Sequence, residues 1–437
     1  MIVSGLVIFI LLLIGWVIYT SKPKFFWIYW LSIYPYVLPL LYLLLKPFLT
    51  PMYERFQPIL EYYPSVILLF ISFLIFRHIL TSKLKIFRLP IALLFLFLIL
   101  QNIFVGVDVK AFLLNIKDVL CVVIPCVLLI INRKIRPNRT SFLKYIYFFI
   151  LIQTFFCILN SVGFKIYDEM IEGGFEEHLI CGTFTRYNHM ANFLSVFFFI
   201  LIYEYHEHKS LQRDKFLLSC FIIALLIFLS GSRMTLLLLL YIMICIVYIY
   251  YGKRYILLFF LLLVSLFFVY IKNNEIFIGQ NADEGTGIER NVIGVIDLAN
   301  SDDLSEGSTL ALSANLFMNY FNSPFIGNGK DHRSVFFYGN PALDPFAGSY
   351  KNDARLAFML VEYGIIGLSL FLFLFSSTFK ACLSYSEEKS NRLYFIAFFY
   401  FLLFSITDAG FWDAQIFSCF FVYVFSSKTN KNLKSLQ

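Results

Sequence analysis

Three short polar clusters in this sequence each lie at the edge of a long apolar run. The first is Ser230-Gly231-Ser232-Arg233, the second is Thr183 to Asn192, and the third is Ser349 to Arg355. Arginine is always charged, and its planar guanidinium can form two parallel hydrogen bonds to a phosphate group. A carboxylate such as Asp353 can accept a proton from a reacting hydroxyl. These residue types therefore predict chemistry on an anionic substrate at a membrane surface.

Each cluster also has a purely structural interpretation. Arg233 follows one apolar run and the next begins at once, which predicts a tight turn, and its side chain could simply reach from the bilayer edge to water. Asn188 and Asn192 lie four residues apart on one helical face, where amides also join neighbouring helices. The structural interpretation of Asp353 is a helix cap. A lone His189 is more typical of a satisfied interior histidine than of a base.

Membrane-spanning helices must position these clusters. Of the 437 residues, 60% are hydrophobic and 14% are charged, whereas soluble domains carry about 25% charged residues. We count twelve or thirteen apolar runs, each near the length of about 20 residues that a transmembrane helix needs. They centre on Ile10, Leu38, Leu69, Phe97, Val123, Ile150, Phe197, Ile223, Met243, Leu263, Leu368, Ala397 and Cys419. The sequence therefore predicts an all-α integral membrane protein, with residues 1–437 forming a single polytopic domain.

The second and third runs and the last pair of runs are less regular. Pro35, Pro39 and Pro64 interrupt the second and third runs, and proline removes a helical hydrogen bond and crowds the preceding turn. The last two runs are predicted to form a hairpin through residues 407–410.

One polar stretch of 80 residues, Asn273 to Asn352, interrupts this apolar pattern. Long loops of this kind are usually functional. Alternating spans place 22 of the 35 basic residues but only 5 of the 28 acidic residues on one face. Basic residues gather on the cytoplasmic side of membrane proteins, so the loop over 273–352 and a smaller loop over 164–184 are predicted to be periplasmic. The net charge of +7 is thus divided between two faces and does not imply nucleic-acid binding.

The large loop contains its own local patterns. Apolar residues recur at helical spacing from Ser308 to Phe321, which predicts a short helix on the membrane surface. Gly327 and Gly329 follow it, and they allow the backbone to approach a neighbour or ligand, although an ordinary turn explains them equally well. Of eight cysteines, Cys181 alone falls in an outer loop, and no spacing suggests a zinc site. We therefore expect no structural metal.

In their order along the chain, these pieces resemble the superfamily of bacterial O-antigen polymerases and O-antigen ligases. The shared elements are an asparagine-bearing span entry, Ser-Gly-Ser-Arg between two spans, and a large outer loop with a short helix followed by Ser-Pro-Phe-Ile-Gly-Asn-Gly. The final element, Glu362-Tyr363-Gly364-Ile365-Ile366-Gly367-Leu368, is similar to the family's Glu-x-Gly-Ile-Ile-Gly-Leu. The resemblance covers Thr183 to Leu372 and implies a helical bundle of the GT-C type in the bacterial inner membrane.

The resemblance implies transfer of a glycan from undecaprenyl pyrophosphate to a sugar hydroxyl on the periplasmic face, with no cofactor or metal. Arginines are then expected to hold the pyrophosphate, namely Arg186, Arg233, Arg290 and Arg355. Other substrate contacts are expected from Asn188, Asn192 and Glu362. In ligases a histidine stands nine residues before the family glutamate, whereas this chain has Asp353 there. This departure assigns the base role to Asp353 and favours a polymerase of O-antigen or capsule repeat units over a ligase.

A second departure and two alternatives remain. The basic residue and tryptophan common at the start of the family's loop helix are replaced by Ser308 and Thr309, so Arg290 is the substitute phosphate contact. An O-antigen ligase would instead use lipid A–core as acceptor. A lipid-linked oligosaccharide flippase would be expected to show two repeated halves and short outer loops. The expected partners are the undecaprenyl-pyrophosphate-linked oligosaccharide, membrane lipid and a chain-length regulator protein.

Overall fold

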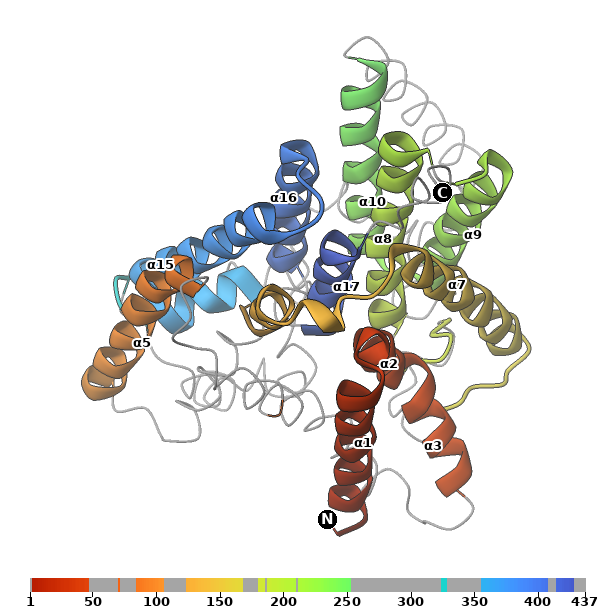
Figure 1. Ribbon diagram of the computed structural model, residues 1–437, viewed down its shortest axis with the longest axis horizontal. Helices are drawn as coiled ribbons and strands as arrows, with labels where there is room; N and C mark the ends of the chain where they lie inside the picture. The colour runs from red at the N-terminus through yellow and green to blue at the C-terminus, as the bar shows by residue number, and fades with distance from the viewer. Residues whose placement is uncertain are drawn as a thin grey trace, which may run out of the picture. The chain divides into compact units, whose positions relative to one another are not determined.

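A computed structural model describes residues 2–46, 70, 84–105, 123–167, 180–184, 187–209, 211–252, 324–327, 355–407 and 414–427. The secondary-structure elements in these residues are helices (Figure 1). One isolated β-bridge among the described residues pairs Asn138 with Ser427. Four described helices are long and apolar enough to cross a membrane: Pro23–Leu45, Lys85–Phe104, Arg139–Ser161 and Glu362–Tyr385. Four shorter apolar helices accompany them. The predicted all-α integral membrane protein is confirmed.

The predicted spans coincide with described helices wherever the structure describes the chain. Eleven of the thirteen predicted centres lie in helices. The other two, Leu69 and Leu263, lie outside the described residues, as do most of the large loop over 273–352 and residues 168–179 of the smaller loop. The polytopic pattern therefore follows from the apolar runs themselves, since each run buries its backbone polar groups in its own helix.

The chain divides into two compact units. The first comprises Met1–Trp30, Pro58–Thr140 and Asp303–Gln437, and the second comprises Leu31–Gln57 and Ser141–Asp302.

In the first unit, a long helix packs against several others. Its helices are α1 (Ile2–Ser21), α5 (Lys85–Val105), a helix over 123–131, α15 (Arg355–Tyr385), α16 (Asn391–Thr407) and α17 (Ala414–Phe425), with the short turns η1 (Pro23–Phe25) and η4 (Arg133–Ile135). α5 runs beside α15 (Figure 1). The outward side of α5 carries exposed apolar side chains, including Ile103 and Phe104. Such a surface suits lipid rather than water.

Phenylalanine rings form the core between α15, α16 and α17. Phe379 of α15 makes ring contacts with Phe401 of α16 and with Phe417 and Phe420 of α17. Phe401 and Phe417 have ring centroids 4.2 Å apart. These contacts place α16 against α17, as the predicted hairpin requires, while residues 408–413 of the connection lie outside the described residues.

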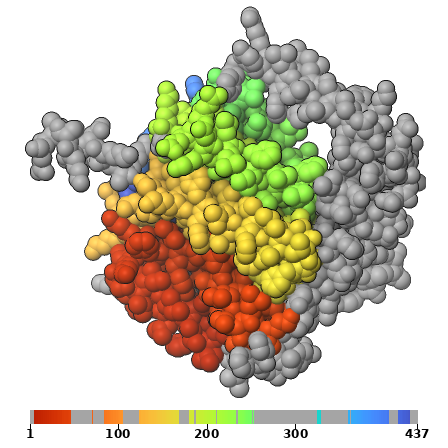
Figure 2. Space-filling model, turned by 90° about the vertical axis from the view of Figure 1, so that its right-hand side faces the viewer, coloured from red at the N-terminus to blue at the C-terminus, as the bar shows by residue number. Residues whose placement is uncertain are grey.

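In the second unit, one helix is buried by its neighbours. α8 (Tyr187–Tyr203) is buried at almost every position and lies against α9 (Arg213–Ser230) and α10 (Arg233–Ile246), which are green in Figures 1 and 2. The unit also contains α7 (Arg139–Ser161) from its third residue, η6 (Glu204–His208) and η7 (Val247–Tyr251). Phe149 of α7 stacks on Phe193 of α8 with centroids 5.7 Å apart. α8 is therefore the central helix of this unit.

The proline-interrupted second span remains one span. α2 (Phe26–Ser32) and α3 (Leu38–Leu45) are joined by a single π-helical turn, η2 (Ile33–Val37), which contains Pro35. A π-turn absorbs the clash and the missing donor that proline introduces into a helix. The predicted second span is confirmed.

Candidate functional site

The connection between α9 and α10 is a tight turn, as Ser-Gly-Ser-Arg predicted. α9 ends at Ser230, Gly231 adopts a φ of 77°, and α10 begins at Arg233. A left-handed glycine is a common helix end because it lacks a Cβ. The backbone N–H of Ser232 donates to Ser230 Oγ over 3.3 Å. Arg233 is therefore the first residue of α10, although its side chain lies outside the described part of the structure.

Asn192 ties the start of α10 to α8. Its Oδ1 accepts a hydrogen bond from Thr235 Oγ1 over 3.0 Å, and the Thr235 hydroxyl also lies 2.7 Å from Ser232 Oγ. All three side chains are buried. Asn192 thus joins α8 to α10 through Thr235, as the structural interpretation of this amide predicts. This chain of hydrogen bonds fixes the turn that carries Arg233.

One turn earlier, the start of α8 carries a half-buried polar pair. His189 Nδ1 lies 2.9 Å from Tyr34 Oη, and the Tyr34 ring also packs against Phe184. Asn188 is half-buried beside His189 in sequence. Sequence reasoning missed Tyr34, and the only signal was the neighbouring Pro35, whose π-turn carries Tyr34. π-turns of this kind are frequent at functional sites.

Two amides of α7 hold the entry to α8. Asn160 Oδ1 accepts hydrogen bonds from the backbone N–H groups of Cys181 and Gly182, over 3.1 and 2.8 Å. Gln153 accepts from the Thr183 N–H over 3.0 Å and donates to its hydroxyl over 2.7 Å. These contacts order the residues that lead to the second polar cluster. Arg186 of that cluster lies outside the described residues.

The described segment of the large loop, Pro324–Gly327, is bound to a break in α15. Gly364 interrupts that helix with φ 65° and ψ −174°. The backbone N–H of Ile365 donates to the Pro324 carbonyl over 2.8 Å, and that of Ile366 donates to the Phe325 carbonyl over 3.1 Å. We call this pairing of Pro324–Gly327 with the break at Gly364 the loop clip.

Two glycines make the loop clip possible. A Cβ at Gly327 would lie 2.4 Å from the Glu362 carbonyl oxygen, and a Cβ at Gly364 would lie 2.4 Å from the Phe325 carbonyl oxygen. Both glycines also have positive φ values, of 71° and 65°. The prediction that Gly327 allows a close backbone approach is therefore confirmed, and the neighbour it approaches is α15 rather than a ligand.

A third segment, from α5, completes the loop clip. Gln101 Nε2 donates to the Ile326 carbonyl over 2.5 Å and to the Glu362 carbonyl over 2.6 Å. Gln101 is buried, and so is the Glu362 side chain. Sequence reasoning expected Glu362 to contact substrate, and the structure gives its backbone a described role in the clip. Gln101 was missed, because it simply ends an apolar run.

The remaining predicted site residues are not described at the level of their side chains. Asp353 and Arg290 lie outside the described residues, as does the predicted loop helix over 308–321. Arg355 is the first residue of α15, and its side chain is likewise outside them. The roles of these residues stay predictions.

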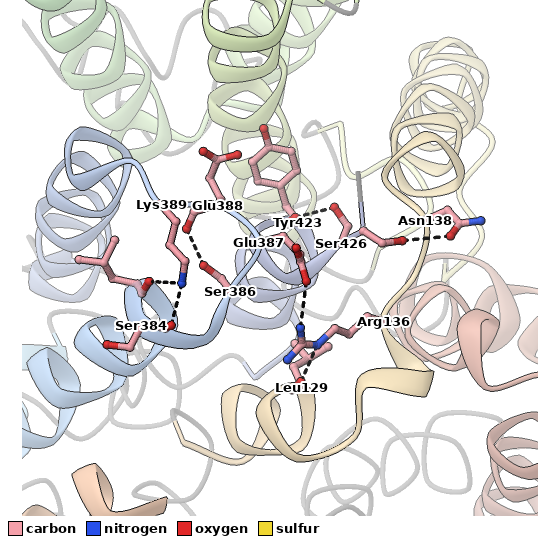
Figure 3. A network of polar contacts seen from close by, with 12 residues as sticks. Leu129, Arg136, Asn138, Ser384, Ser386, Glu387, Glu388, Lys389, Tyr423 and Ser426 are labelled. Atoms are coloured by element: carbon pink, nitrogen blue, oxygen red, sulfur yellow. Dashed lines mark hydrogen bonds and ion pairs between the residues drawn. The ribbon is translucent and has the colours of Figure 1, made fainter. Parts of the chain in front are cut away.

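A second polar cluster, which we call the end junction, lies near the end of α15 and the end of α17. Figure 3 shows four of its residues, Arg136, Glu387, Glu388 and Ser426. Arg139 bonds Glu388 over 3.4 Å, with both side chains buried, and it also donates to Ser426 Oγ over 3.3 Å. Arg136 lies 3.5 Å from Glu387, whose side chain is half-exposed. The chain positions that it joins are the start of α7, the connection from α15 to α16 and the end of α17.

The charge of Arg136 in the end junction is affected by burial and by two neighbouring charged groups. Burial lowers the pKa of the Arg136 guanidinium, the neighbouring Arg133 lowers it further, and Glu387 opposes both effects. Arg136 also donates to the Leu129 carbonyl over 2.8 Å and lies over the Phe425 ring. All of these groups have protein partners, which indicates a structural role rather than a substrate site.

No metal site is evident in the part of the chain that the structure describes. Within those residues, no group of three or more histidine, cysteine, aspartate or glutamate side chains is arranged to hold an ion. Two of the predicted phosphate contacts, Arg233 and Arg355, are the first residues of α10 and α15.

The fold and these features define a polytopic α-helical membrane protein in which a large loop is bound to a broken span. The family model described as O-antigen ligase matches residues 218–372, about a third of the chain. The match includes the α9–α10 turn, the loop-clip segment and Glu362 to Leu368. It confirms the predicted resemblance to the superfamily of O-antigen polymerases and ligases, and it supports a glycosyltransferase-like function of that type. No curated protein matches the chain significantly.

Proposed function

We propose that this protein is a polymerase of O-antigen or capsule repeat units. It joins oligosaccharides carried on undecaprenyl pyrophosphate, and it works at the periplasmic face of the bacterial inner membrane. The observation that carries the proposal is the loop clip inside the matched domain. It joins residues Phe325-Ile326-Gly327 to residues Glu362 to Ile366. These residues belong to the two glycine-containing motifs that the superfamily resemblance rests on.

The proposed reaction is a displacement at the anomeric carbon of the donor glycan. The acceptor hydroxyl oxygen bonds to that carbon, the bond from the carbon to the pyrophosphate oxygen breaks, and the hydroxyl proton passes to Asp353. The electron pair leaves with undecaprenyl pyrophosphate, whose charge Arg186, Arg233, Arg290 and Arg355 stabilise. Fixed cations placed where charge develops lower the barrier of such transfers. Asn188, Asn192 and Glu362 support substrate or the residues that bind it.

The choice of polymerase over ligase rests on Asp353. It stands nine residues before Glu362, where superfamily ligases carry a histidine. A carboxylate and an imidazole can both take the acceptor proton. The preference for a polymerase therefore rests on the departure from the ligase pattern and not on the chemistry of the base. An O-antigen ligase, with lipid A–core as acceptor, is the second candidate, because the matching family model carries that description.

A strain lacking this protein separates the two functions. Deletion of a polymerase leaves a product with a single repeat unit. Deletion of a ligase leaves no glycan attached to the lipid A–core. Purified protein in vesicles with lipid-linked repeat units then supplies the direct test. Polymer formed without lipid A–core establishes the polymerase. Transfer only when lipid A–core is added overturns it in favour of the ligase.

A further inference from the structure

We propose that Gln101 is a positioning residue that holds the large outer loop and the start of α15 in their working arrangement through the loop clip. The proposal rests on the proposed function for its activity measurements but not for its structural ones. Gln101 lies on α5, outside the residues 218–372 that the family model matches. Nothing in the sequence motifs assigns it a role.

The break at Gly364 creates polar groups that need partners. In an unbroken helix the N–H of Ile366 would donate to the Glu362 carbonyl, four residues earlier. Here it donates to Phe325 instead, over 3.1 Å. The Glu362 carbonyl therefore loses its helical donor. A polar backbone group without a partner is costly in the apolar part of a membrane protein, so a break is tolerated only where other segments supply the missing hydrogen bonds.

Gln101 supplies the missing hydrogen bond and extends it to the loop. A primary amide carries two N–H donors on one nitrogen, and Gln101 Nε2 lies within hydrogen-bonding distance of both the Glu362 and the Ile326 carbonyls. One buried side chain thus satisfies the break in α15 and the loop at the same time. A carboxylate or an apolar side chain of the same size can do neither, because it has no donor.

The arrangement fixes more than local stability. The residues of α15 before the break carry Arg355 at their start, and the residues after it, from Ile365 to Tyr385, form most of the span Glu362–Tyr385. Their relative direction is set by Gly364, whose conformation is nearly exclusive to glycine and is strained for other residues. Since the loop segment Pro324–Gly327 occupies the break, the loop and the start of α15 are positioned together. Misplacing reacting groups by about 1 Å can lower a rate about a hundredfold.

The matched test replaces Gln101 by glutamate. Gln101→Glu keeps the shape of the side chain but exchanges the NH2 donor for an acceptor. Ile103→Ala, at a strongly exposed position on the same helix, is the control. We expect Gln101→Glu to lower kcat by about tenfold or more with the KM for the lipid-linked donor nearly unchanged, while Ile103→Ala retains normal turnover.

A cysteine pair supplies the structural readout and the rescue. Phe325→Cys and Ile366→Cys lie at residues joined by a backbone hydrogen bond, and both side chains are exposed. We expect rapid cross-linking in the otherwise unchanged protein, slower cross-linking in Gln101→Glu, and recovery of turnover once the bridge has formed in Gln101→Glu. A bridge replaces the restraint but not any other property of the glutamine.

Three results would overturn the proposal. They are normal turnover in Gln101→Glu, an unchanged cross-linking rate, or a cross-linked Gln101→Glu protein that stays inactive. Failure of the proposed function is distinguishable, because the unsubstituted protein would then make no polymer while its cross-linking rate would still depend on Gln101. In that case the same kinetic comparison is made with lipid A–core as acceptor.

Discussion

Replacing Gly364 by alanine should disrupt the loop clip more than backbone strain alone can explain. Gly364 adopts φ 65° and ψ −174°, and Gly252 adopts the similar values of φ 91° and ψ 169°. An alanine in this region of backbone conformation costs about 1–3 kcal/mol at either position. The surroundings differ, because a Cβ at Gly252 meets nothing within 4 Å, whereas one at Gly364 lies 2.4 Å from the Phe325 carbonyl oxygen. Gly252→Ala is therefore the matched control for strain.

The additional effect at Gly364 can be estimated from the hydrogen bonds at risk. Relieving the contact requires the loop to move away from α15, which breaks the bonds from Ile365 to Pro324 and from Ile366 to Phe325. Each such bond contributes about 0.5–1.5 kcal/mol net, so the two together contribute about 1–3 kcal/mol. That range corresponds to a decrease of about five- to 150-fold in the population that keeps the clip closed.

Two assays on detergent-purified protein measure the difference. The first is thermal unfolding, with size-exclusion chromatography as the readout. The second is polymer formation from lipid-linked repeat units. We expect Gly364→Ala to unfold at a lower temperature than Gly252→Ala and to lose polymerisation by about five- to 150-fold relative to it. Equal stability and equal activity in the two variants would refute the reasoning, because the strain is common to both and only the steric contact differs.

Three further predictions concern single residues. Arg233→Ala should lower polymer formation about tenfold or more, and Arg233→Lys should restore it only in part, because an ammonium cannot form the paired hydrogen bonds of a guanidinium; full polymer from the alanine variant contradicts the assignment. Asp353→Asn should lose turnover by about a hundredfold or more if Asp353 is the base, whereas near-normal turnover identifies a helix cap, since asparagine caps equally well. Glu388→Gln should destabilise the protein by about 3–5 kcal/mol, because it removes the charge that faces the buried Arg139. Glu387→Gln, at a half-exposed position, should cost at most about 1 kcal/mol. Similar thermal unfolding of these two variants speaks against a distinct buried pair.

The spans and their tight connections could be predicted from the sequence because their causes are local. A run of about 20 apolar residues satisfies its own backbone in a helix and needs no distant partner. The turn at Gly231 likewise follows from neighbouring residues, since a left-handed glycine ends α9 and the next apolar run begins at Arg233. Even the proline-interrupted second span held together, because a single π-turn accommodates Pro35.

The contacts that organise the candidate site could not be predicted, because each joins residues far apart in the chain. Gln101 meets Ile326 across 225 positions and Glu362 across 261 positions. A glutamine at the end of an apolar run gives no sign of which carbonyls it will meet. Tyr34 and His189 are separated by 155 positions in the same way. The sequence identified Gly327 as a place of close approach and Gly364 as part of a motif, but only the folded chain shows that the two approach each other.

The loop clip couples the position of the loop segment Pro324–Gly327 to the direction of α15. The donors freed at the break are bound by Pro324 and Phe325, and the Glu362 carbonyl is bound by Gln101. A substrate that displaced the loop would therefore expose backbone groups of α15 in an apolar setting, and the cost of that exposure returns the loop to its place. For the proposed polymerase, we therefore expect the segment Pro324–Gly327 to return to the same position against α15 after each addition.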